Sequence, residues 1–325
     1  MKQLGDASFL VTGGAGFIGS HLAARLAEMK AKEVRILDDL STGFVSNIAP
    51  LLELPNVRFI EGDIRDASLC REACAGIDYV LHHAALGSVS RSIQFPEATH
   101  SVNVDGFFNM LDGARREGVR RFIYASSSSV YGDDAGMPKT EERTGQPLSP
   151  YAVSKALNEA YARTYSRVYG METVGLRYFN VFGPQQNILG PYAAVIPIFV
   201  TKMLANERPS IFGDGKTTRD FTYVENVVQA NLDAVFSEKI GAAGHVFNIA
   251  CGDTIALNDL YHAIAASLNY AQPPEYLPER KGDIRSSWAD ISKAKEWLGY
   301  APVIGWREGL ERTVSWYRQT LGNAR

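Results

Sequence analysis

Apolar residues along the chain form short runs that alternate with longer stretches in which they recur every three or four positions. Residues 9–11 are such a run, and they are followed by a glycine-rich turn and by apolar positions at Ile18, Leu22 and Leu26. A short apolar run predicts a buried strand, whereas a spacing of three or four predicts a helix. The chain therefore opens with a strand, a turn and a helix.

The same alternation continues through the first two thirds of the chain. Further apolar runs at residues 34–37, 57–60, 77–81, 121–126 and 173–176 predict five more strands. Residues 96–117 are predicted to form a long helix, and its apolar positions spread over more than one stripe, which indicates burial on two sides, partly by a second subunit. Strands that alternate with helices predict an α/β fold with a parallel sheet.

The last part of the chain has the spacing of two amphipathic helices, at residues 255–268 and 306–317. A chain of 325 residues is long for one domain, so we expect one large domain and a smaller, dependent one. Neither repeats nor low-complexity linkers separate the two in the sequence.

Composition and charge exclude several classes of function. A formal net charge of −3, from 33 basic and 36 acidic residues, predicts binding to neither nucleic acid nor an anionic membrane through bulk electrostatics. The sequence contains no run of 18 apolar residues and no pattern of a secretory signal, so we expect a cytoplasmic protein. Cys70, Cys74 and Cys251 are a sparse, odd set, which favours reduced, structural thiols over a disulfide framework or a zinc site.

The glycine-rich turn has the chemistry of a phosphate site. Glycines permit a tight turn and let backbone N–H groups approach a pyrophosphate, which the N-terminus of the following helix also attracts. A glycine motif alone is weak, but the flanking strand and helix are the context that supports it. We expect contacts to a dinucleotide from Gly13, Gly16, Phe17, Ile18 and Gly19.

The second predicted strand ends at Asp38 and Asp39, about 20 residues beyond the glycines. An acid at this place accepts the ribose hydroxyls of the adenosine, and it would repel a 2′-phosphate. The pair therefore favours NAD over NADP as the cofactor. The alternative is an ordinary acidic turn at the end of a strand.

The fourth predicted strand leads into His82 and His83, and then into small residues. Adjacent strand residues point to opposite faces of a sheet, so the two histidines do not easily bind one metal ion, and we expect no metal site. Ala84 and Ala85 suit a backbone that passes close beneath a cofactor. Ser88 either reaches a ligand or caps the next helix.

Tyr151 and Lys155 lie four residues apart in a segment of good helix formers, so both side chains project from one face of a helix. By itself such a pair is usually a surface feature of an amphipathic helix. The fifth predicted strand, however, delivers Ser127, Ser128 and Ser129 to its carboxyl end, which is where ligands bind in open α/β sheets.

Seven motifs occur in the order found in the extended short-chain dehydrogenase/reductase family, which the chain resembles over nearly its whole length. They are TGGAGFIG, LDDLSTG, GDIRD, HHAALGSV, YASSSSVYG, SPYAVSK and GLRYFNVFGPQ. The resemblance implies a doubly wound parallel sheet of the Rossmann type, a smaller C-terminal substrate domain and a bound NAD. Within the family the sequence is most similar to nucleotide-sugar epimerases, especially the UDP-N-acetylglucosamine 4-epimerases.

The resemblance also implies how the chain divides and assembles. Residues 1–180 with about 219–250 would form the NAD-binding domain, and about 181–218 with 251–325 the nucleotide-sugar-binding domain. A homodimer is expected, paired through the helices that start near Pro96 and Tyr151.

Further site residues follow from the resemblance alone. On the cofactor side, Asp63 and Ile64 would lie near the adenine and Tyr178 near the nicotinamide, while Asn103 is either a cofactor contact or a packing amide. The residues expected to bind a UDP-sugar are Ser88, Ser127, Ser128, Ser129, Asn180, Val195, Phe212, Arg219, Arg280, Asp283 and Ser287. Phe212 would neighbour the uracil, Arg219 and Arg280 would bind the diphosphate, and Asp283 the ribose.

The family mechanism assigns Tyr151 as the base that takes the proton of the sugar 4-hydroxyl while a hydride passes to the nicotinamide. A free tyrosine has a pKa of about 10, so this role at neutral pH requires a shift of roughly three units, or about 4 kcal/mol. Lys155 and the oxidised nicotinamide would supply two positive charges to lower that pKa. Ser127, with Ser128 as its neighbouring candidate, would hold the 4-keto oxygen.

Two features favour 4-epimerisation of UDP-N-acetylglucosamine and UDP-N-acetylgalactosamine, with UDP-glucose and UDP-galactose as further substrates. Related dehydratases carry an Asp-Glu pair where this chain has Ser128 and Ser129, and elimination of water needs such an acid and base. The resemblance places Ser287 at a family position that lines the sugar pocket, where its small side chain would leave room for an acetamido group. A UDP-glucuronate 4-epimerase and a non-catalytic NAD-binding regulator remain as alternatives.

Overall fold

The structure, a computed structural model, describes residues 4–187, 194–239, 244–279 and 285–322. Its centre is a parallel sheet of seven strands in the order β11-β6-β5-β4-β1-β2-β3. The strands are β1 (Ser8–Thr12), β2 (Glu33–Asp38), β3 (Val57–Glu61), β4 (Tyr79–His82), β5 (Arg121–Ser127), β6 (Glu172–Tyr178) and β11 (His245–Ile249). The strand order reverses between β1 and β4, which in such sheets is where ligands bind. The predicted doubly wound parallel sheet is confirmed.

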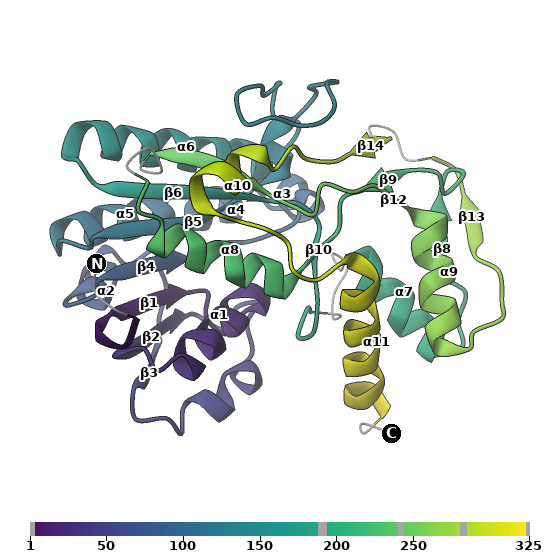
Figure 1. Ribbon diagram of the computed structural model, residues 1–325, viewed down its shortest axis with the longest axis horizontal. Coiled ribbons are helices and arrows are strands. Elements are labelled where there is room, and N and C mark those ends of the chain that lie inside the picture. The colour runs from purple at the N-terminus through teal and green to yellow at the C-terminus, as the bar shows by residue number, and fades with distance from the viewer. Residues whose placement is uncertain (1–3, 188–193, 240–243, 280–284, 323–325) are drawn as a thin grey trace.

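Helices cover both faces of the sheet (Figure 1). One face packs against α1 (Phe17–Glu28), α8 (Val224–Phe236) and α10 (Ser292–Leu298), and the other against α2 (Ala67–Cys74), α5 (Phe107–Arg116) and α6 (Pro150–Tyr169). Successive strand residues alternate between the two cores, since Phe9 and Val11 pack with α1 while Leu10 packs with α2 and α5.

The predicted long helix at residues 96–117 is continuous but not uniform. It consists of α4 (Pro96–His100), a π-helical segment η4 (Ser101–Gly106) and α5, and the short α3 (Val89–Gln94) precedes it. A π-helical turn inside an α-helix often marks a functional position. Here it holds Asn103, whose amide binds both backbone polar groups of Leu86.

A smaller lobe lies beyond the carboxyl ends of the strands, on the right in Figure 1. It contains α7 (Val195–Leu204), α9 (Leu257–Leu268), α11 (Trp306–Gly322) and the pair β8 (Ser210–Phe212) and β13 (Glu275–Leu277). Phe199, Tyr261 and Tyr317 belong to its separate core. The two predicted amphipathic helices are therefore confirmed as α9 and α11.

Short strands join the two lobes. Strand β7 (Val181–Phe182) pairs with β10 (Thr222–Tyr223), and β9 (Thr218–Arg219) lies between β12 (Ile255–Ala256) and β14 (Ser286–Ser287). The buried Asp220, directly after β9, holds the segments that follow β11 and β14, because its carboxylate accepts hydrogen bonds from the backbone N–H groups of Cys251, Gly252 and Ala289. Burial raises the pKa of Asp220 to about 6.

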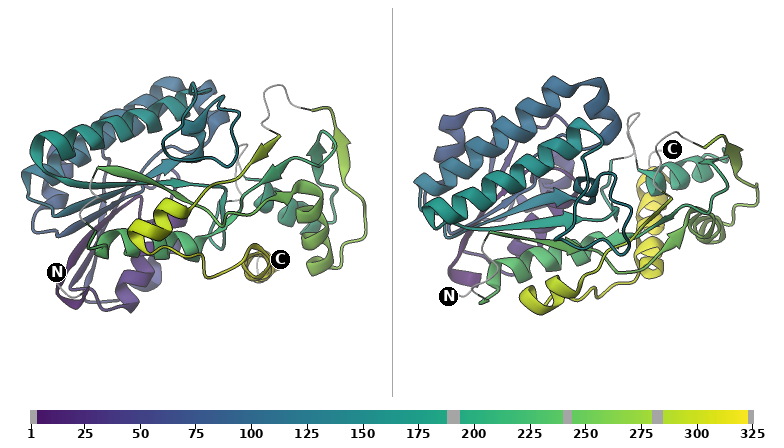
Figure 2. Two further views of the ribbon diagram at one scale, coloured as in Figure 1. Left: turned by 45° about the horizontal axis from the view of Figure 1, so that its top comes forward. Right: turned by 90° about the horizontal axis from the view of Figure 1, so that it is seen from above.

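One segment departs from the expected division of the chain. Residues 251–325 were all expected in the smaller lobe, yet Ile291, Ala294 and Leu298 belong to the core that α1 and α8 form with the large sheet. Figure 2 shows α10 alongside α8, away from α9 and α11. The apolar side of α10 is buried against β11 and α8, so the chain returns to the large lobe before it ends in α11. The remaining domain boundaries stay a prediction.

In the described part of the chain, no helix has the length and apolar character needed to cross a bilayer.

Candidate active site

The glycine-rich turn lies between β1 and α1, at the centre of the sheet. Gly13 has φ +65°, and a Cβ there would lie 2.7 Å from the backbone nitrogen of Ala84. A Cβ on Gly19 would lie 2.1 Å from the Gly13 carbonyl oxygen. Gly16 caps α1 and has no side chain that could satisfy the first N–H groups of the helix. The turn therefore requires glycine and leaves a cradle that side chains would fill.

Asp38, at the end of β2, braces this turn. Its carboxylate accepts hydrogen bonds from the backbone nitrogens of Ala15 and Leu40, both at 2.9 Å. Burial raises the pKa of Asp38. Asp39 accepts from the backbone and hydroxyl of Ser41. Because an ionised carboxylate offers about four lone-pair sites, these contacts leave acceptor capacity for ribose hydroxyls.

A cavity of about 550 Å³ extends from the glycine-rich turn to the start of α6. The predicted site residues that line it are Gly13, Gly16, Phe17, Ile18, Gly19, Asp38, Asp39, Ile64, Ala84, Ala85, Ser88, Ser127, Tyr151, Lys155, Tyr178 and Asn180. The structure thus brings most of the predicted cofactor residues and the Ser-Tyr-Lys group into one space.

Several lining residues were missed by the sequence reasoning, among them Thr42, Gly62, Arg91, Gln186 and Asn187. Most of them lie within or beside the motifs LDDLSTG, GDIRD, HHAALGSV and GLRYFNVFGPQ. Their place in these motifs was the available signal, but their side chains have no chemistry that distinguishes them from neighbouring residues.

Tyr151 lies in the first turn of α6, which begins at Pro150, directly after the N-cap residue Ser149. The Ser149 hydroxyl caps the helix by accepting from the Ala152 nitrogen at 3.1 Å. The Lys155 ammonium donates to the Ala125 carbonyl oxygen at 2.9 Å and lies 5.9 Å from the centre of the Tyr151 ring. The predicted common helix face is confirmed.

The pKa values of this pair differ from the sequence expectation. Burial raises the pKa of Tyr151, and a hydrogen bond from Ser127 opposes only part of that rise. Burial lowers the pKa of Lys155 to about 8, against the effect of the nearby Glu159 carboxylate. The chain alone therefore does not lower the pKa of Tyr151, because removal from water disfavours the phenolate more than its protein neighbours favour it.

The two adjacent histidines occupy opposite faces of the sheet, as predicted. His82 lies 2.9 Å from the Thr12 hydroxyl and stacks on Phe122, whereas His83 stacks on Tyr178 and lies 2.9 Å from its hydroxyl. The amide of Asn231 also donates to that hydroxyl, at 2.8 Å. The roles of His83 and Asn231 in fixing Tyr178 carried no sequence signal. Among the residues that the structure describes, no group of three or more His, Cys, Asp or Glu side chains is arranged for a metal ion.

Asn103, Asp63, Ser128 and Ser129 are among the predicted residues that do not line the cavity. The side-chain amide of the buried Asn103 forms hydrogen bonds within the protein, with the backbone of Leu86 at 2.8 and 3.1 Å and with the Ser154 hydroxyl at 3.2 Å. Of its two predicted roles, these bonds favour the packing amide over the cofactor contact. The Asp63 carboxylate pairs with Arg65, which lowers its pKa. Ser128 and Ser129 lie in the short η5 (Ser128–Tyr131), where the Ser129 nitrogen donates to Ser127.

The predicted substrate residues lie on several elements of the smaller lobe and the junction. Val195 starts α7 and Phe212 ends β8. Arg219 of β9 is paired in register with Ser287 of β14, so the structure brings these two together. The Asn180 amide donates to the Asp220 carbonyl oxygen at 2.9 Å. Arg280 and Asp283 lie outside the described residues.

The site fits a dinucleotide. The glycine cradle, the helix start without a side-chain cap and the carboxylate of Asp38 beside it are the three parts that a pyrophosphate and a ribose require. Together with the Ser-Tyr-Lys group, they define a dinucleotide-binding α/β protein with acid–base residues at the carboxyl ends of its strands.

Comparison with known proteins identifies the family. The model of the NAD dependent epimerase/dehydratase family matches residues 9–250, and the chain belongs to this family. It is 40% identical to a putative UDP-glucose 4-epimerase of Methanocaldococcus jannaschii over 95% of this chain and 98% of that protein. The cofactor of the family is NAD.

Two solved structures are similar over nearly the whole chain. A UDP-N-acetylglucosamine 4-epimerase from Methanobrevibacter ruminantium M1 has 38% identity and a TM-score of 0.91, with 97% of this chain and 99% of that one covered. A dTDP-glucose 4,6-dehydratase from Streptomyces venezuelae, solved with NAD, has 34% identity and a TM-score of 0.88, with 97% and 98% covered. The solved structures similar to this chain therefore include both an epimerase and a dehydratase.

Proposed function

We propose that this protein is a UDP-sugar 4-epimerase that interconverts UDP-N-acetylglucosamine and UDP-N-acetylgalactosamine through a 4-keto intermediate, with UDP-glucose and UDP-galactose as further substrates. The observation that carries the proposal is that Ser127, Tyr151 and the buried Lys155 line the same cavity as the glycine-rich turn. The names of the similar proteins support the reaction class, since several are UDP-sugar 4-epimerases.

Each residue of the group has a definite task. Gly13, Gly16 and Asp38 would hold the cofactor. Bound NAD supplies a reversible hydride acceptor and, when oxidised, a positive charge in the cavity. Tyr151 accepts the proton of the sugar 4-hydroxyl and later returns it, Ser127 donates a hydrogen bond to the oxygen on carbon 4, and Lys155 stabilises the phenolate.

The burial of Tyr151 has a consequence for when it acts. Since burial raises its pKa in the chain alone, the phenol keeps its proton until positive charge is added beside it.

The residues after Ser127 favour epimerisation over dehydration. Ser128 and Ser129 stand where related dehydratases have an acid and a base, and a serine hydroxyl titrates far outside the range that a proton shuttle needs. The Ser129 hydroxyl oxygen is buried and has no partner among the described residues, so no neighbouring group activates it.

The size of Ser287 favours acetamido sugars. It lies beside Arg219, which is proposed to bind the diphosphate, so the sugar end of a nucleotide held there would be close to a small side chain. A UDP-glucuronate 4-epimerase is the second candidate, and a non-catalytic regulator is the third, which the intact Ser127, Tyr151 and Lys155 disfavour.

A substrate panel tests the proposal. The purified protein, loaded with NAD, is incubated separately with the UDP forms of N-acetylglucosamine, N-acetylgalactosamine, glucose, galactose and glucuronate, and products are resolved by chromatography. We expect interconversion of the first two, and loss of activity in Tyr151→Phe with an unchanged NAD content. Turnover of glucuronate alone would identify the second candidate, and no turnover of any UDP-sugar would contradict the enzyme assignment.

A further inference from the structure

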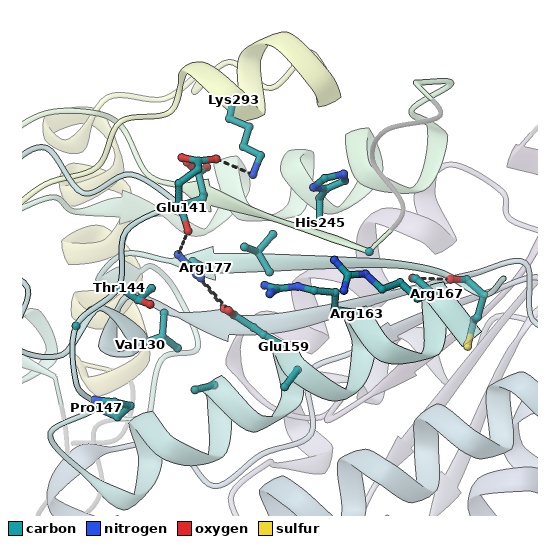
Figure 3. A pocket seen from close by; sticks show the side chains of 18 of the residues that line it. Val130, Glu141, Thr144, Pro147, Glu159, Arg163, Arg167, Arg177, His245 and Lys293 are labelled. Atoms are coloured by element: carbon teal, nitrogen blue, oxygen red, sulfur yellow. Dashed lines mark hydrogen bonds and ion pairs between the residues drawn. The ribbon is translucent and has the colours of Figure 1, made fainter. Parts of the chain in front are cut away.

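A second cavity, of about 880 Å³, lies beside the C-terminal half of α6. Its walls are α6 from Ala156 onwards with the C-cap residue Gly170, the loop that carries Glu141 and Pro147, the edge strand β11 and Lys293 of α10. Figure 3 shows this hollow from close by, with β6 beneath it. It shares no lining residue with the cofactor cavity.

The sequence of α6 connects the two cavities. Every fourth residue from Tyr151 onwards carries a polar or charged group, namely Tyr151, Lys155, Glu159, Arg163 and Arg167. Residues four apart lie nearly above one another on a helix, and this stripe winds slowly around it. The first two members line the cofactor cavity, and the last three line the second cavity.

The acidic groups of the second cavity already have partners. Glu159 forms a buried ion pair with Arg177 at 2.8 Å, and Glu142 pairs with Lys293 at 3.1 Å. The Glu141 carboxylate is buried and accepts a hydrogen bond from the Asn248 nitrogen at 2.8 Å.

Two cations in the cavity remain without an anion. Arg163 and Arg167 are exposed and form no hydrogen bond or ion pair with any residue that the structure describes, and Figure 3 shows their side chains extending into the hollow below His245. The pKa of His245 is lowered by burial and further by Lys293 and Arg163. The lining of the hollow therefore carries one more formal positive charge than negative, from Arg163, Arg167, Arg177 and Lys293 against Glu141, Glu142 and Glu159.

We propose that this cavity is a binding site for a small anion that presents phosphate oxygens. Two guanidinium groups one helical turn apart have more N–H donors than the two oxygens of one carboxylate can accept. A phosphate or diphosphate has enough oxygens to accept hydrogen bonds from both groups. Arg163 and Arg167 make the direct contacts, and Lys293 adds charge from the opposite wall.

Binding to the NAD-loaded full-length protein tests this assignment. Inorganic pyrophosphate and ribose 5-phosphate are titrated separately by calorimetry at one fixed ionic strength, because charge interactions of this kind are screened by salt. We expect saturable binding of at least one probe, and affinity at least about tenfold weaker in the double variant Arg163→Gln/Arg167→Gln, since two charge-assisted contacts are lost. Tighter binding of ribose 5-phosphate would identify an organic phosphate as the preferred ligand, and tighter binding of pyrophosphate an inorganic one.

Arg58→Gln is the matched control. Arg58 is an exposed arginine of β3, outside both cavities, and has no hydrogen bond or ion pair within the described chain. Its replacement should leave the affinity unchanged, and circular dichroism should give the same melting temperature for all three proteins. Binding that is equally strong in the double variant, or no saturable binding of either probe, would overturn the proposal. Neither outcome depends on the catalytic activity.

Discussion

Tyr151 and Lys155 respond to the same burial in opposite ways. Loss of water raises the pKa of the phenol and lowers that of the ammonium to about 8, because in each case the charged form is disfavoured. The proposed acid–base pair is thus largely removed from water before any ligand is bound, with Lys155 buried and Tyr151 partly buried. The position of the pair on one helical face is encoded locally, but the direction of the two shifts depends on the packing around them.

The pKa of Lys155 predicts a pH limit for catalysis. Lys155 is protonated below its pKa of about 8 and neutral above it, so the charge that stabilises the Tyr151 phenolate is lost as pH rises through this value. We expect kcat/KM to fall on the alkaline side of about 8 and the fall to disappear in Lys155→Arg, which keeps its charge throughout. An identical alkaline limb in an active Lys155→Arg enzyme would assign the limb to another group.

Ser287 predicts which sugars fit the site. A tyrosine in its place should lower kcat/KM for UDP-N-acetylglucosamine by at least about tenfold, because the acetamido group would meet the ring, and should leave UDP-galactose nearly unaffected. Initial rates with both substrates on the same preparation give the comparison. Equal losses on the two sugars would mean that the substitution disturbs the site as a whole.

At the scale of elements, α6 carries most of the functional groups of the large lobe. Its stripe from Tyr151 to Arg167 faces the sheet and the two cavities, and Glu159 stands in the middle of it. The Glu159 carboxylate accepts from the Ser126 hydroxyl at 2.6 Å and from Arg177 at 2.9 and 2.8 Å, so it joins α6 to β5 and β6 immediately behind Ser127.

Glu159→Gln should therefore destabilise the fold strongly. Removing one partner leaves the Arg177 guanidinium buried without its anion, which typically costs about 3–5 kcal/mol. Urea unfolding of the two proteins measures the difference. Glu172→Gln is the control, since its ion pair with Arg121 is half exposed and is expected to contribute about 1 kcal/mol or less. Similar losses in both variants would show that burial does not govern the strength of these pairs.

The elements of the large lobe could be predicted from sequence because their signals are local. The strand runs and the helix spacing around Gly13 or Tyr151 lie within about twenty residues, and the fold follows from their order. The return of α10 to the large sheet could not be predicted, because an amphipathic helix does not specify its partner. The hydrogen bonds that fix Tyr178 from His83 and Asn231 also join distant segments, and no local spacing encodes them.

At the scale of the whole molecule, α6 has a second stripe on its outer side. Val153, Leu157, Tyr161 and Val168 are 37 to 63% exposed, and Phe108 of α5 packs against Tyr161. Contiguous exposed apolar residues of this kind usually mark a protein interface, and a two-fold axis would place the stripe of one chain against that of its partner. The stripe lies on the side of α6 that faces away from both cavities, so dimerisation would leave them open.

We therefore expect a homodimer that depends on this stripe. The double variant Leu157→Glu/Tyr161→Glu places charge at the centre of the stripe and should convert the protein to a monomer. The free-energy penalty of burying two unpaired carboxylates from each chain would exceed the stabilisation from the apolar contact. Light scattering coupled to size exclusion measures the mass. Val303→Glu, at an apolar residue that is 69% exposed in another region, should leave the assembly unchanged. A wild-type protein with the mass of one chain, or a double variant that still has the mass of two, would contradict the assignment of the interface.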